Sequence, residues 1–358
     1  MTHLEKLKSV LGGANPDAVI ISSGINQRYI SGFPFTDGYL LVTRGKSYLV
    51  TDFRYEEAAR AGADPGLEVS APQHGMLDFI AERIFADECR SVAFEEEALP
   101  YAAYEKFRAA LPGVELVPVA SAILWGLREI KDDNELKNIA AAQDIADAAF
   151  EHILKFIKPD MTEREVALEL EFFMRGQGAE AMAFETIAVS GSASSMPHGV
   201  PRDRKLERGF LTMDFGAKVN GYCSDMTRTV VLGSANADMK RLYNTVLSAQ
   251  LAALEVIREG AGLSEVDLTA RGIIDRAGYE GCFGHKLGHG VGLFIHENPR
   301  LSPTAPEDAR LVSGQVVTVE PGIYIAGKYG CRIEDLVCVT KDGLINLTHS
   351  PKELIELF

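Results

Sequence analysis

The dipeptide Asn220-Gly221 is the feature of this sequence that most limits how the chain can fold. Asn-Gly is the strongest short signal for a two-residue type I′ β-hairpin, because both turn positions need a positive φ angle. If these residues form the turn, the register of both flanking strands is fixed. Asp214 then lies opposite Thr227, and Asp225 points to the same face because it is two residues from Thr227 on one strand.

Two carboxylates on one face of a hairpin could bind metal ions. Diagonal neighbours on paired strands lie roughly 7–8 Å apart at the backbone, which suits two ions roughly 3.5–4 Å apart. The same residues could instead be two solvated aspartates on an edge hairpin. The turn alone leaves both interpretations open.

A second candidate segment is rich in glycine and histidine. Residues 284–296 contain three of the eight histidines, His285, His289 and His296. The spacing of His285 and His289 would suit one helix face, but the surrounding glycines favour a loop or a bulged strand. Glycine also lets a backbone approach a ligand closely. These histidines are candidate ligands, with a structural role as the alternative.

Two further strand-like segments carry charged residues among apolar residues of the kind that are usually buried. Glu320 follows the apolar run 315–319, where a carboxylate needs a partner. Arg332 and Glu334 share one face of the next strand, and a surface ion pair is the simpler explanation for them alone. All the segments together supply four carboxylates and one imidazole, an oxygen-rich set that suits two divalent cations.

The 358 residues favour two domains at roughly 150 residues each. The first third alternates strand-like and helical patterns, which indicates an α/β domain, with a boundary near 120–128. The second part has capping-box helix starts at Asp132 and Thr162 and antiparallel strand patterns, and is therefore predicted to be α+β. Further helices are expected near 76–85, 101–110, 239–258 and 264–277, a hairpin over 39–50, and strands at 210–216, 222–232, 291–296, 315–320 and 331–340.

The candidate ligands resemble, in order and spacing, the dinuclear metal site of the pita-bread metallopeptidases; they are Asp214, Asp225, His289, Glu320 and Glu334. The segments around them are similar to those of the Xaa-Pro branch, the prolidases and aminopeptidases P: Asp214–Ala217, Ser224–Thr229, Gly288–Gly292, Val319–Gly322 and Arg332–Asp335. The resemblance implies an α+β pita-bread (creatinase/aminopeptidase-like) catalytic domain over residues 126–358. Asn26–Phe33 resembles the signature of a smaller α/β creatinase/prolidase-type N-terminal domain, expected over residues 1–125.

The resemblance also implies how these side chains bind metal. Asp214 would chelate one ion, Asp225 and Glu334 would bridge both, and His289 and Glu320 would complete the other. A water between the ions would ionise and attack the scissile carbonyl. Glu320 would carry the proton of this water to the leaving nitrogen.

Other residues match substrate-side positions of the family. His198, His285 and His296 match catalytic histidines, with His198 near the leaving group and also a substrate-binding residue. Arg300 matches the arginine that binds the carboxylate of a dipeptide, with a surface loop residue as its alternative. Arg332 is expected to orient Glu334 or to hold the charge network of the site, in contact with substrate.

The implied activity is metal-dependent hydrolysis of the Xaa-Pro bond in dipeptides or short peptides with a free N-terminus. Arg300 slightly favours a dipeptidase, and an aminopeptidase P that cleaves longer peptides is the main alternative. A creatinase-like amidinohydrolase or a non-catalytic binding paralogue is disfavoured, because the ligand set is intact. Two divalent ions are expected, Mn²⁺ first, with Co²⁺, Zn²⁺ or Fe²⁺ as alternatives, and a homodimer is implied.

Composition restricts the partners and the compartment. The formal charge of −15 disfavours binding to nucleic acid or to anionic membranes. No apolar run approaches the roughly 18 residues of a membrane helix, and residues 1–17 do not resemble a secretory leader. The five cysteines are odd in number and form no CxxC pair, so a cytoplasmic, reducing environment is expected.

Overall fold

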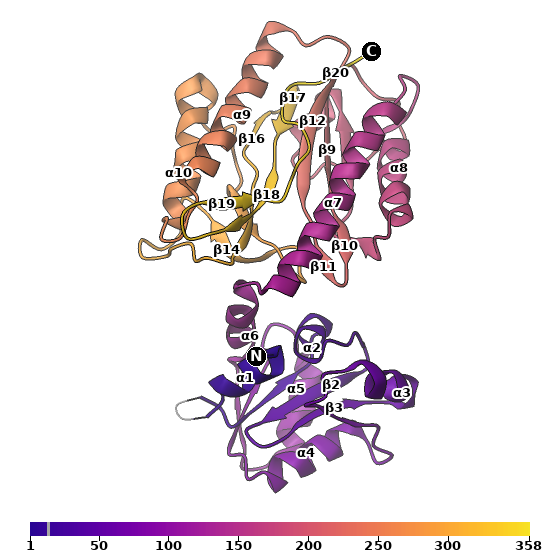
Figure 1. The fold of residues 1–358 in the computed structure, drawn as a ribbon, viewed down its shortest axis with the longest axis vertical. Coiled ribbons are helices and arrows are strands. Elements are labelled where there is room, and N and C mark those ends of the chain that lie inside the picture. The colour runs from indigo at the N-terminus through magenta and orange to yellow at the C-terminus, as the bar shows by residue number, and fades with distance from the viewer. Residues whose placement is uncertain (13–14) are drawn as a thin grey trace. The chain divides into compact units, whose positions relative to one another are not determined.

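The computed structural model describes residues 1–12 and 15–358 and divides into two compact units, residues 1–128 and 129–358 (Figure 1). The division falls inside helix α6 (Ala120–Glu129). The boundary expected from the sequence, between residues 125 and 126, lies in the same helix.

The first unit is built on one six-stranded sheet with the strand order β4-β3-β2-β1-β5-β6. Strand β1 (Ala18–Ile21) is buried along its length and pairs antiparallel with β2 and parallel with β5. The predicted hairpin and both predicted helices of this unit are present. The elements are α1 (His3–Val10), α2 (Gly24–Ser31), β2 (Gly38–Thr43), β3 (Ser47–Thr51), α3 (Phe53–Gly62), β4 (Glu68–Ser70), α4 (Met76–Ala86), β5 (Ser91–Phe94), α5 (Tyr101–Ala110) and β6 (Glu115–Val117).

The second unit places short, mainly antiparallel sheets between two helix pairs (Figure 1). Helices α7 and α8 pack on the β8-β9-β12 side, and α9 and α10 pack on the strands β15 to β18. The predicted capping boxes at Asp132 and Thr162 are confirmed. The helices are α7 (Asp133–Phe156), α8 (Glu163–Gly176), α9 (Ala237–Val256) and α10 (Leu263–Ile274).

The strands of the second unit form four sheets, β20-β12-β9-β8, β11-β10-β7, β14-β13-β15-β18-β19 and β16-β17. They are β7 (Ala181–Met182), β8 (Ile187–Ser190), β9 (Gly209–Phe215), β10 (Ala217–Val219), β11 (Tyr222–Cys223), β12 (Met226–Leu232), β13 (Gly288–Gly290), β14 (Glu297–Leu301), β15 (Val316–Val319), β16 (Gly322–Ile325), β17 (Tyr329–Arg332), β18 (Asp335–Val339), β19 (Leu344–Asn346) and β20 (Glu356–Leu357).

The hairpin predicted from Asn220-Gly221 is confirmed in register. Asn220 has φ 48° and Gly221 has φ 86°, as a type I′ turn requires. Asp214 pairs with Thr227 in the β9–β12 ladder, as predicted. The turn therefore sets the register that places Asp214 on β9 and Asp225 just before β12.

Replacing Gly221 by alanine is expected to lower the free energy of unfolding by about 1–2 kcal/mol, because an L-residue is strained at positive φ. Urea unfolding followed by circular dichroism measures the change. Gly176→Ala is the matched control: Gly176 lies in α8, a Cβ there meets nothing within 4 Å, and helical Gly→Ala gains roughly 0.5–1 kcal/mol. Equal losses in both variants would contradict the turn argument.

Three of the predicted strands are wrong in detail. Residues 291–296 form a bent loop instead of a strand, because the Gly292 amide donates to the Phe294 carbonyl and the Phe294 amide donates to the Glu297 carboxylate. The runs 222–232 and 331–340 are each interrupted, at 224–225 and 333–334. Both interruptions fall at candidate metal ligands.

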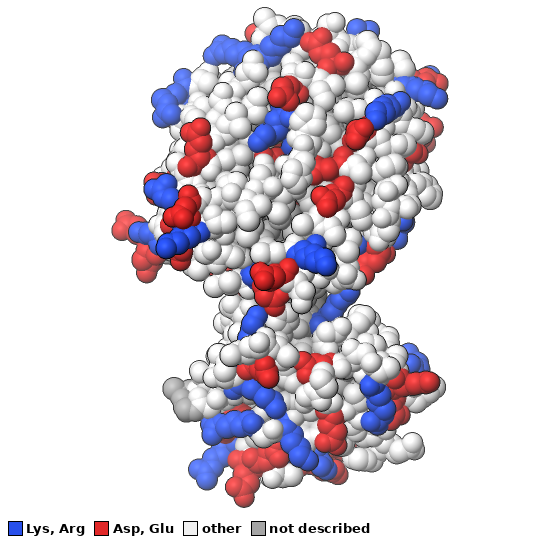
Figure 2. Space-filling model, viewed as in Figure 1, with Lys and Arg blue, Asp and Glu red and all other residues white. Residues whose placement is uncertain are grey.

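The surface carries acidic and basic side chains side by side on the face drawn in Figure 2. Within residues 1–12 and 15–358, no helix is long and apolar enough to span a membrane.

Candidate metal centre and substrate cavity

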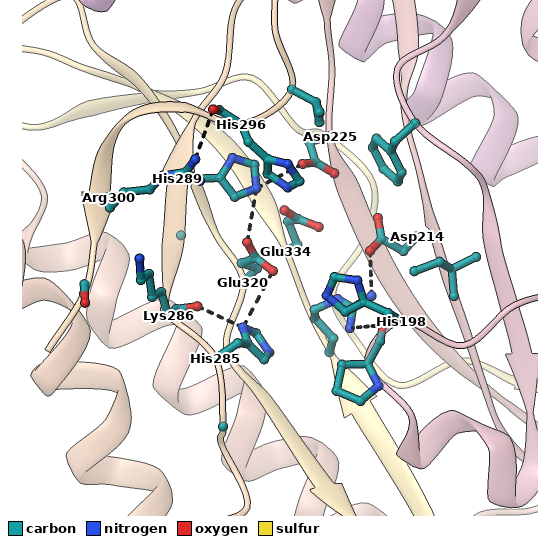
Figure 3. Close-up of a pocket in the computed structure, with 18 of the residues that line it drawn as sticks. His198, Asp214, Asp225, His285, Lys286, His289, His296, Arg300, Glu320 and Glu334 are labelled. Atoms are coloured by element: carbon teal, nitrogen blue, oxygen red, sulfur yellow. Dashed lines mark hydrogen bonds and ion pairs between the residues drawn. The ribbon is translucent and has the colours of Figure 1, made fainter. Parts of the chain in front are cut away.

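Every site residue predicted from the sequence lines one cavity of about 840 Å³ in the second unit (Figure 3). The ends of separate strands bring the candidate metal ligands there: Asp214 from β9, Asp225 from the break before β12, His289 from β13, Glu320 from the end of β15 and Glu334 from the break between β17 and β18. The other five are His198, His285, His296, Arg300 and Arg332. The alternative of two solvated aspartates is wrong, because Asp225 is only 5% exposed.

The bulge in β13 turns His289 toward the carboxylates. The β13–β14 register shifts between His289 and Gly290, as the glycines of this segment predicted. The ring Nδ1 lies 3.0 Å from the Gly290 carbonyl, so Nδ1 carries the proton. Burial lowers the pKa of His289 to about 3. The ring is therefore neutral, and its Nε2 lone pair faces Asp225 at 3.5 Å and Glu320 at 3.4 Å.

The carboxylates lie too close together to be charged without a counter-ion. Burial first, and then the neighbouring carboxylates, raise the pKa of Asp225 and Glu334 well above their usual values. Burial also raises the pKa of Glu320 to about 8. One cation inside the cluster is supplied by Arg332, whose Nη2 lies 2.6 Å from Asp214. One guanidinium does not neutralise four carboxylates.

The cluster fits divalent cations. Single ligand atoms of Asp225, His289 and Glu334 lie within 4.8 Å of one another. Among the described residues, the buried Oδ1 atom of Asp214 has no hydrogen-bond partner. A lone pair that faces carboxylates and an unpartnered carboxylate oxygen both suit a positive ion, since buried polar groups are usually satisfied. Oxygen donors with one imidazole suit a hard or borderline dication.

Two threonines that the sequence analysis did not single out hold the carboxylates in place. The Thr227 hydroxyl accepts from Arg332 Nε at 2.9 Å and donates to Glu334 at 2.7 Å. The Thr318 hydroxyl accepts from the His289 amide at 3.0 Å and donates to Glu320 at 3.2 Å. Thr318 is two residues before Glu320, so the two-residue period was a signal for it, whereas the Thr227–Glu334 contact joins residues 107 positions apart and had no such signal.

Tyr324 was also missed. Its hydroxyl accepts from Arg332 Nη1 at 2.8 Å and lies 2.9 Å from His285 Nε2. The other nitrogen of His285 lies 2.8 Å from the Lys286 carbonyl and therefore donates. The phenol thus donates to Nε2, and burial lowers the pKa of His285 to about 4. A half-buried tyrosine hydroxyl usually finds such a partner, but the strand position of Tyr324 alone did not indicate which.

The remaining cavity residues lie on either side of the carboxylates. His296 packs edge-on to His289, with ring centroids 4.6 Å apart. Arg300 on β14 donates from Nη2 to the His296 carbonyl at 3.0 Å. In Figure 3, His198 lies on the Asp214 side and Arg300 on the opposite side. Arg332 and Glu334 are 3% and 1% exposed, so the simpler explanation of a surface ion pair is wrong.

Clustered carboxylates around a neutral imidazole, open to a cavity lined by further histidines, suit metal-dependent hydrolysis. Comparison with known families gives the same class. Residues 137–341 match metallopeptidase family M24, and residues 3–130 match the creatinase/prolidase N-terminal domain. The chain belongs to metallopeptidase family M24, and the pita-bread fold expected from the sequence is confirmed.

Relatives match over nearly the whole chain. An Xaa-Pro dipeptidase of Pyrococcus horikoshii is 39% identical over 357 residues, which cover 98% of this chain and 99% of the relative. The solved structure of an Xaa-Pro dipeptidase from Bacillus anthracis has a TM-score of 0.95 at 42% identity, with 99% of each chain covered. An X-Pro aminopeptidase from Thermotoga maritima has a TM-score of 0.91 at 34% identity, covering 98% of this chain and 100% of its own.

Proposed function

We propose that the protein is an Xaa-Pro dipeptidase that hydrolyses dipeptides with a C-terminal proline. The observation that carries the choice is Arg300. Its side chain lines the cavity and is partly buried, and within the described residues it forms no ion pair with a carboxylate. A partly buried cation without a counter-ion is costly, and the carboxylate of a bound dipeptide supplies one.

The charged side chains that line the cavity favour one orientation of the bound substrate. Asp214 belongs to the acidic cluster, and its strand partner Ile187 and Phe184 line the wall beside it. We assign the free ammonium group to this acidic side and the carboxylate to Arg300. Because an Xaa-Pro amide has no N–H, recognition rests on the two charged ends and on the proline ring.

We propose that two divalent ions bind to Asp214, Asp225, His289, Glu320 and Glu334, and that Mn²⁺ is the native metal, since four of these five ligands are carboxylates. When bound, such ions polarise a carbonyl and lower the pKa of a bound water to near neutrality.

The protein side chains supply the rest of the reaction. Glu320, deprotonated when it binds metal, accepts the proton of the attacking water and delivers it to the prolyl nitrogen. His296 lies beside His289, where it donates to the carbonyl oxygen. His198 lies on the Asp214 side (Figure 3), beside the residue that carries the ammonium group, so the leaving-group role that the family resemblance implied for it does not fit this orientation. His285 lies 4.0 Å from Glu320 and Arg332 fixes Asp214, so both position the reacting groups.

We also propose a cytoplasmic homodimer. The five cysteines are free in the structure, which agrees with a reducing compartment. Light scattering of the purified protein measures the assembly.

The test compares Ala-Pro with Ala-Pro-Ala, each with added Mn²⁺ and with a chelator. We expect metal-dependent cleavage of Ala-Pro and weak cleavage of Ala-Pro-Ala. Arg300→Met should lower kcat/KM for Ala-Pro by about 100-fold, near 2.7 kcal/mol, through loss of a charge-assisted pair. Cleavage of Ala-Pro-Ala in preference to the dipeptide would instead identify an aminopeptidase P, and no cleavage of either would overturn the Xaa-Pro assignment.

A further inference from the structure

Lys286 is a cavity residue that no step above uses. Its backbone is held on both sides: the His285 ring donates to the Lys286 carbonyl at 2.8 Å, and Arg271 Nη2 donates to the preceding His285 carbonyl at 2.9 Å. Its side chain is exposed and lines the same cavity. In Figure 3, Lys286 and Arg300 are both drawn on the side of the carboxylates away from Asp214 and His198.

Four cationic side chains line this cavity, and two of them, Arg271 and Arg332, are paired with carboxylates. Arg271 is bound by Asp267 through contacts of 2.7 and 3.0 Å, and Arg332 by Asp214 at 2.6 Å. In the part of the chain that the structure describes, Lys286 and Arg300 have no carboxylate within 4.0 Å. Two of the cavity's cations, Lys286 and Arg300, therefore have no direct ion pair with a carboxylate of the described residues, although the charge of Glu320 acts on Arg300.

We propose that Lys286 is a specificity-determining residue that supplies a second cation, beside Arg300, for the C-terminal carboxylate of the substrate. This inference rests on the proposed dipeptidase function and adds a residue to its substrate recognition. Arg300 reaches the carboxylate from β14, and Lys286 reaches it from the segment before β13. The two cations together favour a substrate that ends at the proline with a free carboxylate.

The terminal carboxylate fits this pair better than an acidic side chain does. The ammonium group and the first side chain of a dipeptide belong to one residue, which lies on the Asp214 side in the orientation above. A glutamate side chain there would start far from Lys286 and close to the acidic cluster. The proline carboxylate is at the opposite end of the substrate, where both cations lie.

The test measures kcat and KM of wild type and Lys286→Met for Ala-Pro and for Ala-Pro-amide, which has no C-terminal charge. We expect KM for Ala-Pro to rise about fivefold, the size of a partly exposed ion pair, with kcat and the KM for the amide nearly unchanged. Lys286→Arg retains the charge and should restore most of the affinity. High salt should weaken Ala-Pro binding less in Lys286→Met than in wild type.

Three outcomes would overturn the inference. Equal KM changes for Ala-Pro and its amide would mean that Lys286 acts through structure. A change in the ratio of Glu-Pro to Gln-Pro cleavage would mean that Lys286 binds the side chain of the first residue of the dipeptide. Unchanged constants in an active enzyme would mean that it binds no substrate. Failure of the wild type to cleave any of these dipeptides would instead refute the proposed function itself.

Discussion

Glu334→Gln is expected to lower kcat/KM for Ala-Pro by at least about 1,000-fold, or about 4 kcal/mol, and to lower the bound metal per chain. Glu334 is 1% exposed, and ligand atoms of Glu334, Asp225 and His289 lie within 4.8 Å of one another. Glutamine keeps the volume and an oxygen acceptor for the Thr227 hydroxyl, but it removes the charge and places an NH₂ group in the cluster. A dication loses one anionic ligand, while the fold keeps its packing.

Metal analysis after dialysis against Mn²⁺, together with kinetics, measures both effects. Glu185→Gln is the matched control, because Glu185 lines the same cavity but is exposed and stands outside the cluster. This control makes the same charge change and should retain metal and most activity. Full metal content and wild-type kcat/KM in Glu334→Gln would show that Glu334 is not a ligand.

The sequence predicted those parts of the site that local rules determine. Asn220-Gly221 allows one turn type, and the turn sets the register that brings Asp214 and Asp225 to one face. The capping boxes at Asp132 and Thr162 likewise depend on residues three positions apart. Such signals are contained within a few residues and are therefore readable from a single sequence.

The missed features depend on contacts distant in sequence. Thr227 and Glu334 are 107 residues apart, and the Glu334 amide bonds the Thr227 carbonyl on β12 rather than continuing its own strand. The alternating pattern around Arg332 gives no sign of this distant contact with Thr227. It therefore predicted one unbroken strand. In the same way, the contact of Glu297 with the Phe294 amide bends a segment whose apolar residues favour a strand.

Without metal, the protein is expected to lose stability as pH rises from 6.5 to 8. A carboxyl group whose pKa is raised in the folded state binds more protons there than when unfolded, so the unfolding free energy falls as pH rises through its folded pKa. Glu320 has its pKa raised from 4.5 to about 8, and Asp225 and Glu334 shift in the same direction. At 1.36 kcal/mol per pKa unit, Glu320 alone contributes a loss of about 2 kcal/mol over this window.

The histidines determine the lower limit, pH 6.5, of the range in which stability is expected to fall as pH rises. The pKa values of His289 and His285 are lowered to about 3 and about 4, so their effect has the opposite sign: stability rises with pH until the unfolded histidine value of about 6.5 is passed. Below pH 6.5 the two effects oppose each other. Above pH 6.5 only the carboxyl groups with raised pKa values still change the unfolding free energy. They therefore determine whether stability rises or falls with pH.

Bound metal should reverse this slope, because the ions bind the deprotonated carboxylates and compete with protons. Thermal unfolding from pH 6.5 to 8, with chelator and with Mn²⁺, is the measurement. We expect the two melting curves to diverge as pH rises, and Glu320→Gln to have a flatter slope in chelator. A metal-free protein whose stability is constant or rises over this range, or equal slopes with and without Mn²⁺, would mean that the clustered carboxylates are not the metal site.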